Sequence, residues 1–315
     1  MMTLCVTDIR DEAERIRTFE LRDPGGAELP PFEAGAHLEV EVKLPNGQAA
    51  TRSYSLFGDP RDRRRYWIAV LKEPGGQGGS RFMHDRLEPG SSLRVAPPEN
   101  GFPLLDADHT ILVAGGIGIT PLLSMVQTLG HHQRSYELHY AARTPARMAF
   151  GERIAALAGE RAHFYFTRVE PPQRVDLEAL LATPRRGAQV YVCGPQDLLR
   201  TVTSLGEKAG WPRGQIHFES FGPARLPGDR VIEVRLERSA LTLQVAPGET
   251  ILDAILDAGV LAPYECRRGQ CAACMTRVVA GEPDHRDVCL SQELREDYLC
   301  PCVSRAHSTH LTLDL

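Results

Sequence analysis

The sequence predicts a multi-domain protein: an antiparallel β-barrel, then an α/β domain with a parallel sheet, then a small α+β domain. Three observations support this. Short strand-like segments fill residues 3–100, strands alternate with helices over 109–209, and six of the eight cysteines fall within 266–302. Many short strands separated by turns favour a barrel, and alternating strands and helices favour a parallel sheet. We place the domains at residues 1–102, 103–224 and 225–315.

Composition and length narrow the class only slightly. The chain has 315 residues, of which 42% are hydrophobic and 24% charged, which is ordinary for a globular protein of two or three domains. No run reaches the roughly 18 apolar residues that a membrane span needs, and nothing resembles a secretory signal. We therefore expect a cytoplasmic monomer with reduced cysteines and with no membrane or nucleic-acid partner.

Negative charge is concentrated at the carboxyl-terminal end. Residues 231–315 contain 8 Lys and Arg against 13 Asp and Glu, a net charge of −5, whereas residues 1–230 are neutral overall. A docking partner for this end is expected to present a basic patch. The other interpretation is that a small acidic domain is simply well solvated.

The barrel is predicted from six strand-like segments, several of them separated by Pro-Gly or Asn-Gly turns. In the fourth segment Arg52, Tyr54 and Leu56 share one face, and Ser53 and Ser55 share the other. A guanidinium grips a phosphate and a phenol packs on a planar ring, although such patterns are common in strands. The segments are 3–9, 15–22, 37–43, 50–57, 66–71 and 92–96.

A glycine-rich loop, residues 75–80, leads into a helix predicted over 80–87. We expect Ser80 to cap this helix. The backbone N–H groups of the loop, including that of Gly79, then favour a bound anion at the helix N-terminus. The other interpretation is a flexible loop, which is disfavoured because the glycines run straight into a helical pattern.

Residues 109–118 combine a buried strand with a tight turn formed by Gly115, Gly116 and Gly118. A helix is predicted to follow, with Thr120 as its cap and a proline at its first position. Glycines let a pyrophosphate approach the backbone, and the helix end supplies N–H groups. The turn is not the G-x-G-x-x-G fingerprint, and a turn of this kind is often only a tight crossover.

Further strands and helices continue the parallel sheet, with ligands expected at the carboxyl ends of its strands. Cys193, Gly194 and Pro195 follow such an end, where a small cysteine beside a glycine leaves room for a nicotinamide ring. A plain core thiol is the other interpretation of Cys193. The strands are predicted at 136–141, 162–167 and 189–193, and the helices at 147–157, 176–182 and 195–209.

Cys266, Cys271 and Cys274, with a fourth cysteine far downstream, have the C-x4-C-x2-C…C spacing of a plant-type [2Fe–2S] site. Small residues such as Gly269 let the loop fold around an inorganic core. The main alternative is structural zinc, which usually shows two close cysteine pairs; disulfides are disfavoured. A helix over 252–258, ending at Gly259, and strands at 231–238, 241–245, 275–281 and 310–313 surround this loop.

The fourth ligand is Cys302 or Cys300. The segment Cys302-Val303-Ser304, before the last strand, resembles the closing segment of a plant-type ferredoxin domain, which favours Cys302. Cys300 is expected on the same side of an extended strand and stays an alternative. Cys289 is interpreted as a packing thiol.

The R-x-Y-S-L strand, the glycine-rich loop and the ferredoxin-like end together resemble the phthalate dioxygenase reductase family, over essentially the whole chain. The resemblance implies an FMN-binding barrel, a nucleotide domain and a β-grasp-type ferredoxin domain. It implies that Arg52, Gly79 and Ser80 bind the phosphate of FMN. Gln77 stands where the family often has arginine, which slightly weakens the positive field at the phosphate without abolishing binding. The full set of implied FMN contacts in these two motifs is Arg52, Ser53, Tyr54, Ser55, Gly79 and Ser80.

The G-G-I-G-I-T-P and C-G-P motifs are similar to those that bind NAD(P)H in the ferredoxin reductase superfamily. The segment 217–222 resembles the end of that nucleotide domain, which makes Phe221 the candidate to cover the flavin, and residues 222–230 are interpreted as a linker. The implied NADH contacts are Gly115, Gly116, Gly118, Thr120, Cys193, Gly194 and Pro195.

The resemblance implies the reductase component of a Rieske-type aromatic oxygenase or demethylase, with vanillate demethylase reductases nearest in pattern. Hydride passes from NADH to FMN, and single electrons pass through the [2Fe–2S] cluster to a separate terminal Rieske non-haem iron oxygenase, which docks near the acidic end. The implied cluster ligands are Cys266, Cys271, Cys274 and Cys302.

Other interpretations stay open. The acceptor could be of another kind, the chain could be a non-catalytic cofactor-binding protein or a self-sufficient oxidoreductase, and FAD could replace FMN. NADPH in place of NADH would need a contact to its 2′-phosphate, for which Arg143, Thr144 and Arg147 are the candidates.

Overall fold

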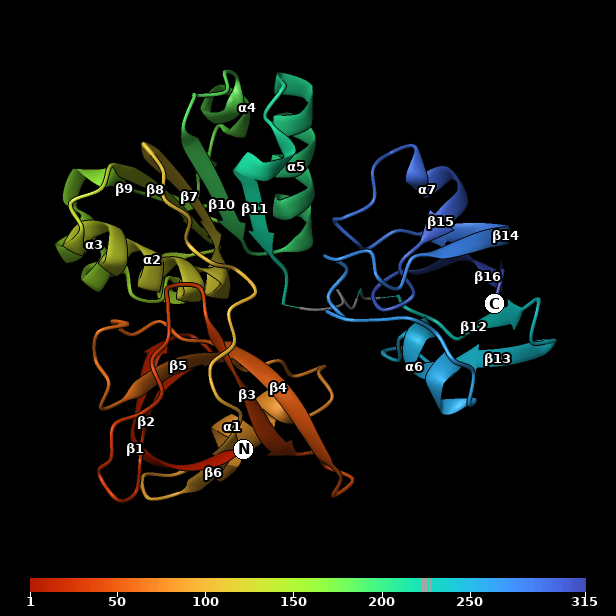
Figure 1. Ribbon diagram of the computed structural model, residues 1–315, viewed down its shortest axis with the longest axis horizontal. Coiled ribbons are helices and arrows are strands. Elements are labelled where there is room, and N and C mark those ends of the chain that lie inside the picture. Colours follow the sequence, from red (N-terminus) through yellow and green to blue (C-terminus); the bar gives the residue numbers. More distant parts are fainter. Residues whose placement is uncertain (222–225, 227) are drawn as a thin grey trace. The chain divides into compact units, whose positions relative to one another are not determined.

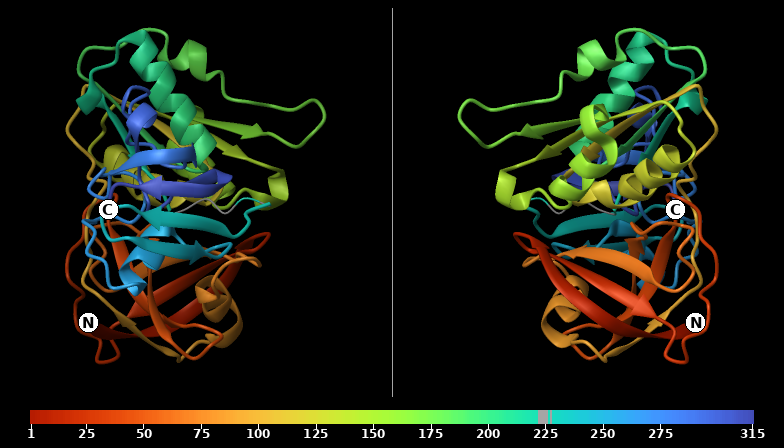
Figure 2. Two further views of the ribbon diagram at one scale, coloured as in Figure 1. Left: turned by 90° about the vertical axis from the view of Figure 1, so that its right-hand side faces the viewer. Right: turned by 90° about the vertical axis from the view of Figure 1, so that its left-hand side faces the viewer.

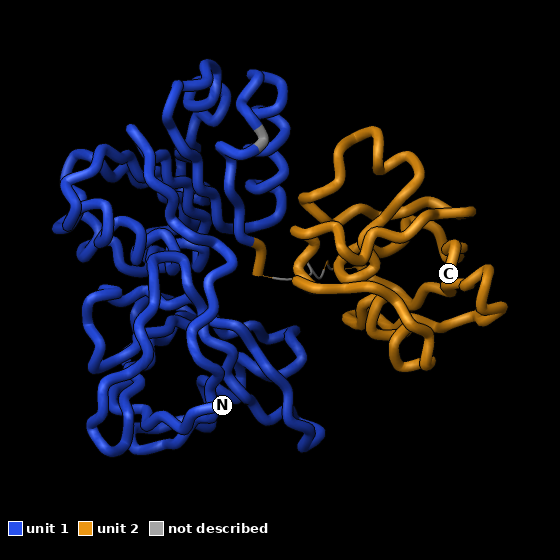
Figure 3. Tube along the Cα trace, viewed as in Figure 1, with its two compact units in different colours: residues 1–219 blue, residues 220–315 orange. Residues whose placement is uncertain are grey.

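A computed structural model describes the chain except for residues 222–225 and 227 and the side chain of Arg213. The chain forms two compact units, residues 1–219 and 220–315 (Figure 3), which we name unit 1 and unit 2. Most of the predicted linker, residues 222–230, lies outside the described residues. Among the described helices, none combines the length and the apolar character needed to cross a membrane.

The first sheet of unit 1 is antiparallel, with strand order β4-β3-β6-β1-β2-β5 (Figure 1). Phe19, Leu38 and Ile68 are fully buried in its interior. Leu56, just beyond β4, pairs with Ile68 of β5, so the two end strands meet and curl the sheet into the predicted barrel. Its elements are β1 (Met2–Ala13), β2 (Ile16–Arg22), β3 (His37–Lys43), β4 (Ala49–Ser55), β5 (Tyr66–Leu71), α1 (Gly79–Arg86) and β6 (Ser92–Val95).

The second sheet of unit 1 is parallel, with strand order β11-β10-β7-β8-β9. Helices α2 and α3 cover one face, where Leu112, Tyr140 and Tyr191 are buried, and α5 covers β10 and β11 on the other (Figures 1 and 2). Its strands are β7 (His109–Gly115), β8 (Tyr136–Ala142), β9 (Ala162–Phe166), β10 (Ala188–Cys193) and β11 (Ile216–Glu219). Its helices are α2 (Ile119–His131), α3 (Gly151–Ala158), α4 (Leu177–Leu181) and α5 (Gln196–Ala209), with short 3₁₀ turns at Gly116–Gly118, Pro145–Arg147, Gly159–Arg161 and Arg213–Gln215.

Unit 2 is a mixed five-stranded sheet with helix α6 packed on it, an α+β arrangement. The order is β13-β12-β16-β14-β15, with β12 and β16 parallel. The Thr250 side chain caps α6 by accepting the Asp253 N–H, and Gly259 ends it at φ 78°, as the sequence predicts. The elements are β12 (Ile232–Leu236), β13 (Leu241–Val245), α6 (Ile251–Asp257), β14 (Thr276–Asp284), α7 (Leu294–Asp297), β15 (Tyr298–Leu299) and β16 (Arg305–Leu313).

Two predicted helix caps are wrong. Helix α1 begins at Gly79 after a left-handed Gly78, so Ser80 is its second residue and not its cap. Helix α2 begins at Ile119, because the 3₁₀ turn before it runs directly into the helix. Thr120 therefore lies in the first turn of α2, where its hydroxyl donates to the carbonyl of Ile117 at 3.0 Å.

The expected extended strand through Cys300 and Cys302 is also wrong. The N–H groups of Val303 and Ser304 both donate to the Cys300 carbonyl, at 3.1 and 2.9 Å, so the chain turns here. The side chains of Cys300 and Cys302 therefore do not follow the two-residue repeat of a strand. The structure also adds elements that the sequence did not suggest: β11, α7 and β15.

Candidate cofactor sites

The glycine-rich loop, residues 75–80, brings the N-terminus of α1 to strand β4. Gly78 is left-handed (φ 108°), and a Cβ there would lie 2.4 Å from Pro45, so only glycine fits. Gly79 packs on Arg52: a Cβ on Gly79 would lie 3.0 Å from its Cγ. Two motifs far apart in the sequence therefore meet at one place.

The Arg52 guanidinium lies against this loop. One of its nitrogens donates to the Thr51 carbonyl at 2.8 Å, and the other donates to Gln77 Oε1 at 2.5 Å. The Gln77 oxygen thus accepts an N–H group that an anionic oxygen would also accept. With the positive end of α1 beside it, and with no side chain capping that end, the arrangement fits a phosphate group.

The remaining predicted flavin contacts lie near this loop or on β4. The Ser80 hydroxyl oxygen accepts the Glu73 N–H at 3.0 Å, which leaves its hydrogen available for donation to a phosphate. Tyr54 packs against the barrel core, and burial raises its pKa, so the phenol stays neutral. Ser55 is buried at the end of β4, whereas Ser53 is exposed.

The predicted nucleotide contacts come together in two loops, residues 115–118 after β7 and 193–195 after β10, which we name the paired loops. The two strands are neighbours in register, with Cys193 opposite Ala114. A Cβ on Gly118 would lie 2.2 Å from the Cys193 carbonyl oxygen, and one on Gly194 would lie 2.9 Å from the Gly115 Cα. These glycines therefore let the two backbones touch, which is a packing role.

Residues in and directly after the paired loops differ in how open they are to a ligand. Gly116 is left-handed (φ 56°), with no other atom within 4 Å of where its Cβ would be. Cys193 is fully buried. Gln196, directly after Pro195, is 9% exposed, and among the described residues neither its amide nitrogen nor its amide oxygen has a hydrogen-bond partner.

Within the described part of the chain, the Gln196 amide is buried and unpaired directly after one of the two glycine loops. A buried amide without a hydrogen bond costs about 1–3 kcal/mol, so this position fits a polar ligand such as the amide or phosphates of NADH. Gln196 was not among the residues predicted from the sequence. The one feature of the sequence that could have indicated it is its position directly after Cys-Gly-Pro.

The cysteine loop, residues 266–274, brings sulfur atoms together in pairs. Cys266 and Cys271 are hydrogen-bonded neighbours, and the Cys274 and Cys302 sulfurs lie 3.3 Å apart. Arg267, Gly269 and Ala272 have positive φ angles of 52°, 70° and 57°, which turn the loop back on itself. Two pairs of thiols in one loop region are the donor set of a [2Fe–2S] cluster.

Backbone N–H groups also point at these sulfurs. Arg268 donates to Cys266 at 3.3 Å and Ala273 to Cys271 at 3.5 Å, and Gly269 donates to Cys302. Hydrogen bonds from the Cys300 and Cys302 thiols lower the pKa of Cys274 and so favour the thiolate that binds iron. The backbone N–H bonds to the sulfur atoms also stabilise a negatively charged cluster.

The other two cysteines of unit 2 form a third sulfur pair. Cys289 and Cys300 lie 3.6 Å apart, beside the buried Asp287. Cys302 is held by the loop amide of Gly269, whereas Cys300 also contacts Cys289. This difference supports Cys302 as the fourth ligand.

One of the NADPH candidates is already engaged. The Arg147 guanidinium makes two hydrogen bonds to the Glu14 carboxylate, at 3.0 and 2.7 Å. Arg147 is therefore not free to bind a 2′-phosphate, which favours NADH. Phe221 is the second residue of unit 2 and is 48% exposed.

The chain resembles known proteins along its whole length. Residues 234–307 match the 2Fe-2S iron-sulfur cluster binding domain, and residues 99–216 match the N-terminal domain of dimethylamine monooxygenase subunit DmmA-like proteins. The chain is 38% identical to vanillate O-demethylase oxidoreductase of Pseudomonas sp. (strain HR199 / DSM 7063), covering 100% of both. It is 40% identical to the heme-dependent oxidative N-demethylase beta subunit of Ectopseudomonas mendocina (strain ymp), covering 100% and 99%.

A solved structure matches equally well. It is phthalate dioxygenase reductase, described as a modular structure for electron transfer from pyridine nucleotides to [2Fe–2S]. The match has a TM-score of 0.74 and 39% identity, and covers 100% of this chain and 98% of that one.

A barrel, a parallel sheet with glycine loops and a cysteine-loop domain, in this order, define a modular flavin and iron–sulfur oxidoreductase. The chain belongs to the phthalate dioxygenase reductase family. The family, the fold class and the cofactor classes predicted from the sequence, namely flavin, NADH and [2Fe–2S], are thereby confirmed. The roles of individual residues stay predictions.

Proposed function

We propose that this chain is the reductase component of a two-component oxygenase or demethylase. It takes hydride from NADH onto FMN and delivers single electrons, through a [2Fe–2S] cluster, to a separate oxygenase. The observation that carries the proposal is the presence of two cysteine pairs at the cysteine loop, Cys266 with Cys271 and Cys274 with Cys302, in a chain that also carries the glycine-rich loop and the paired loops. The relatives named as reductase or demethylase components support it.

The protein must convert a two-electron transfer into one-electron transfers, because NADH gives two electrons together and an iron–sulfur cluster takes one. FMN supplies the conversion, since a flavin accepts hydride and releases electrons singly. The chain positions the parts: Arg52 and Ser80 hold the phosphate of FMN, Tyr54 packs by its ring, and the paired loops hold the nicotinamide. No side chain needs to act as a general base.

The finer assignments follow from the same reasoning. The domains are 1–102 for FMN, 103–224 for NADH and 225–315 for the cluster. Phe221 is assigned to cover the flavin because it lies in the segment 217–222, which resembles the end of the nucleotide domain. FMN is preferred to FAD, because we find no stretch in the barrel suited to an adenine.

The partner is a terminal Rieske non-haem iron oxygenase acting on an aromatic acid, and it docks through a basic surface. Unit 2 offers exposed carboxylates on and beside α7, at Glu293, Glu296 and Asp297. A haem-containing acceptor is the second candidate, because one relative is the beta subunit of a heme-dependent demethylase. Titration of purified candidate oxygenases of both kinds, at low and high salt, distinguishes them: the true partner is reduced fastest, and salt slows the transfer.

An anaerobic titration with NADH tests the reductase itself. Full reduction is expected at about 1.5 equivalents of NADH per chain, since the flavin takes two electrons and the cluster takes one. Flavin and cluster absorption should bleach together, and acid should release FMN. An endpoint at one equivalent with no iron, or a protein that NADH does not bleach, would overturn the proposal.

A further inference from the structure

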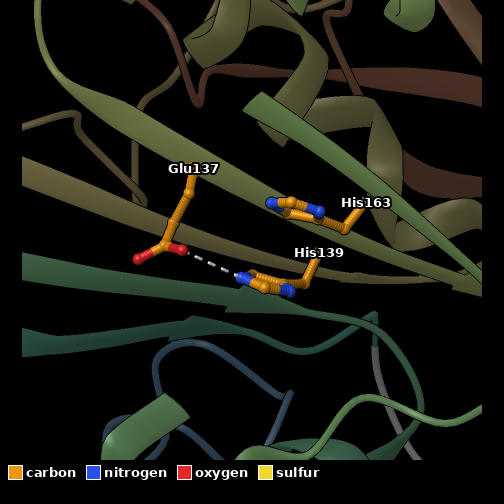
Figure 4. A group of neighbouring side chains, drawn as sticks. All are labelled: Glu137, His139 and His163. Atoms are coloured by element: carbon orange, nitrogen blue, oxygen red, sulfur yellow. Dashed lines mark hydrogen bonds and ion pairs between the residues drawn. The ribbon is translucent and has the colours of Figure 1, made fainter. Parts of the chain in front are cut away.

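Glu137, His139 and His163 form a polar cluster on the parallel sheet of unit 1 (Figure 4). Glu137 and His139 belong to β8, and His163 lies opposite His139 on the edge strand β9. One possible ligand atom from each residue lies within 4.8 Å of the other two. A single small cation is therefore within reach of all three side chains after a small adjustment.

The cluster is separate from the paired loops. Glu137 lies near the start of β8, four residues before Ala141, which pairs with Gly115 at the loop end of the sheet. That separation is about 13 Å of strand for Glu137 and about 7 Å for His139, two residues before Ala141. Tyr140 is buried beneath α2 and α3, so Glu137 and His139 face the opposite side of the sheet.

The two β8 donors already have the spacing that a tetrahedral ion requires. Glu137 Oε2 and His139 Nε2 are 3.3 Å apart. Zinc bonds of about 2.0–2.2 Å at a tetrahedral angle place two ligand atoms about 3.4 Å apart. An ion can therefore replace the hydrogen bond between these atoms with little movement of either side chain.

Neighbouring residues orient both donors. Glu137 Oε1 accepts from His109 Nε2 and Arg185 Nη1, each at 3.2 Å, which leaves Oε2 for the ion. His139 Nδ1 lies 3.0 Å from the Tyr165 hydroxyl. With an ion on Nε2, the ring proton sits on Nδ1 and is donated to Tyr165, whose hydroxyl can either donate or accept. A second contact of this kind is usual for a metal-binding histidine.

His163 must move furthest. Its ring stacks on that of His139, with centroids 4.9 Å apart and planes 24° from parallel. His163 is exposed, whereas the His139 side chain is only 10% exposed. Its nitrogen has to come closer by at most about 1.4 Å to reach the distance that tetrahedral zinc needs, which a rotation of the exposed ring can supply.

We propose that Glu137, His139 and His163 bind one divalent transition ion of the zinc type, with water as the fourth ligand. Two imidazoles and one carboxylate select such an ion over magnesium or calcium. The ion would join β8 to β9, and because it binds only the folded state it would stabilise the edge of the sheet.

Calorimetric titration of the flavin- and cluster-loaded protein with Zn²⁺ tests this. One equivalent is expected to bind, at least tenfold more weakly to His163→Ala and to Glu137→Gln. The control His132→Ala removes an exposed histidine outside the cluster and is expected to bind as the wild type does. Zinc-edge X-ray absorption of the complex should show nitrogen and oxygen ligands without sulfur.

A melting experiment separates binding from folding. Without zinc, wild type and His163→Ala should melt alike, since His163 is exposed; with zinc, only the wild type should melt at a higher temperature. Absence of zinc binding, equal binding to wild type and His163→Ala, or sulfur among the ligands would each overturn the proposal.

Discussion

Cysteines mark one loop region of this chain and glycines mark another, and the structure uses the two kinds of residue differently. In the cysteine loop the sulfur atoms of Cys266, Cys271, Cys274 and Cys302 converge, so the motif residues act through their side chains. In the paired loops Gly118 and Gly194 act through the absence of a side chain, because the other loop's backbone fills the space. A motif residue can thus bind a ligand directly, or it can stabilise the fold that forms the ligand's site.

The largest effect is expected where a side chain is a ligand. Cys274→Ser should lower bound iron from about two atoms per chain to nearly none, because Cys274 sits centrally among the sulfur atoms. NADH-dependent reduction of a dye by the flavin should persist, since unit 1 keeps its own core. Iron and sulfide analysis and a dye-reduction assay measure the two properties.

Cys289→Ser is the matched control for this prediction. It alters the thiol that pairs with Cys300 at 3.6 Å, outside the four assigned ligands, and should keep the full iron content. A cluster that survives Cys274→Ser, or one lost in Cys289→Ser, would contradict the ligand assignment.

The next effect concerns the fold. Gly118→Ala places a Cβ 2.2 Å from the Cys193 carbonyl oxygen, and backbone cannot swing aside as a flexible side chain can. We expect a loss of about 3 kcal/mol in the free energy of unfolding. Urea denaturation followed by tryptophan fluorescence reports it, because both tryptophans, Trp67 and Trp211, lie in unit 1.

Gly116→Ala is the comparison for Gly118→Ala. Its φ of 56° costs about 1–2 kcal/mol for a residue with a side chain, but its Cβ would meet no other atom. Equal losses for the two variants would show that backbone contact between the paired loops does not matter.

The sequence predicted the fold well where hydrophobic alternation is regular. All six barrel strands and the parallel strands through β10 lie within a few residues of their expected positions. It failed where contacts outside the hydrophobic pattern decide the backbone: the start of α1 depends on Gly78 packing against the distant Pro45, and the turn at Cys300 depends on local hydrogen bonds from Val303 and Ser304. Neither contact leaves a periodic signal in the sequence.

The same limit applies to the sites. Residues chosen for their chemistry, such as the four cysteines, come together. Gln196 and the Gln77 contact to Arg52 were missed as site features, because burial and hydrogen bonding of a single amide cannot be read from residue order.

Acid should weaken unit 2 by a smaller amount. Hydrogen bonds from the buried Arg286 guanidinium lower the pKa of Asp229, and Asp284 binds the same guanidinium at 2.6 Å. A carboxyl whose folded pKa is lowered contributes stability that is full above its unfolded pKa, about 3.9, and is lost as the pH falls through the lower folded pKa. The urea midpoint of unit 2 should therefore fall between about pH 5 and pH 2.

Cluster circular dichroism follows this unit, with Asp229→Asn as the comparison. The variant lacks an ionisable partner of Arg286, so its midpoint should depend less on pH over that range. If both proteins lost the same amount of stability in acid, the contribution assigned to Asp229 would be wrong.

The smallest predicted effect tests whether a side chain directly after the paired loops binds its ligand, as the cysteine side chains are predicted to do. Gln196 keeps both amide atoms buried without a partner, and a hydrogen bond to NADH would satisfy one of them. Gln196→Ala should raise the KM for NADH about fivefold, which corresponds to about 1 kcal/mol. The kcat should stay within about twofold, and the variant should be no less stable than the wild type, because removing an unpaired buried amide removes its desolvation cost.

Gln189→Ala is the control for Gln196→Ala, since Gln189 lies on β10, the strand that precedes Gln196, but its amide oxygen is already 2.7 Å from the His217 ring nitrogen. Its KM should not change. A Gln196→Ala enzyme with unchanged KM and lower stability would show that the amide supports only the fold. The paired loops would then bind NADH through backbone atoms alone, whereas the cysteine loop would bind its cluster through side chains.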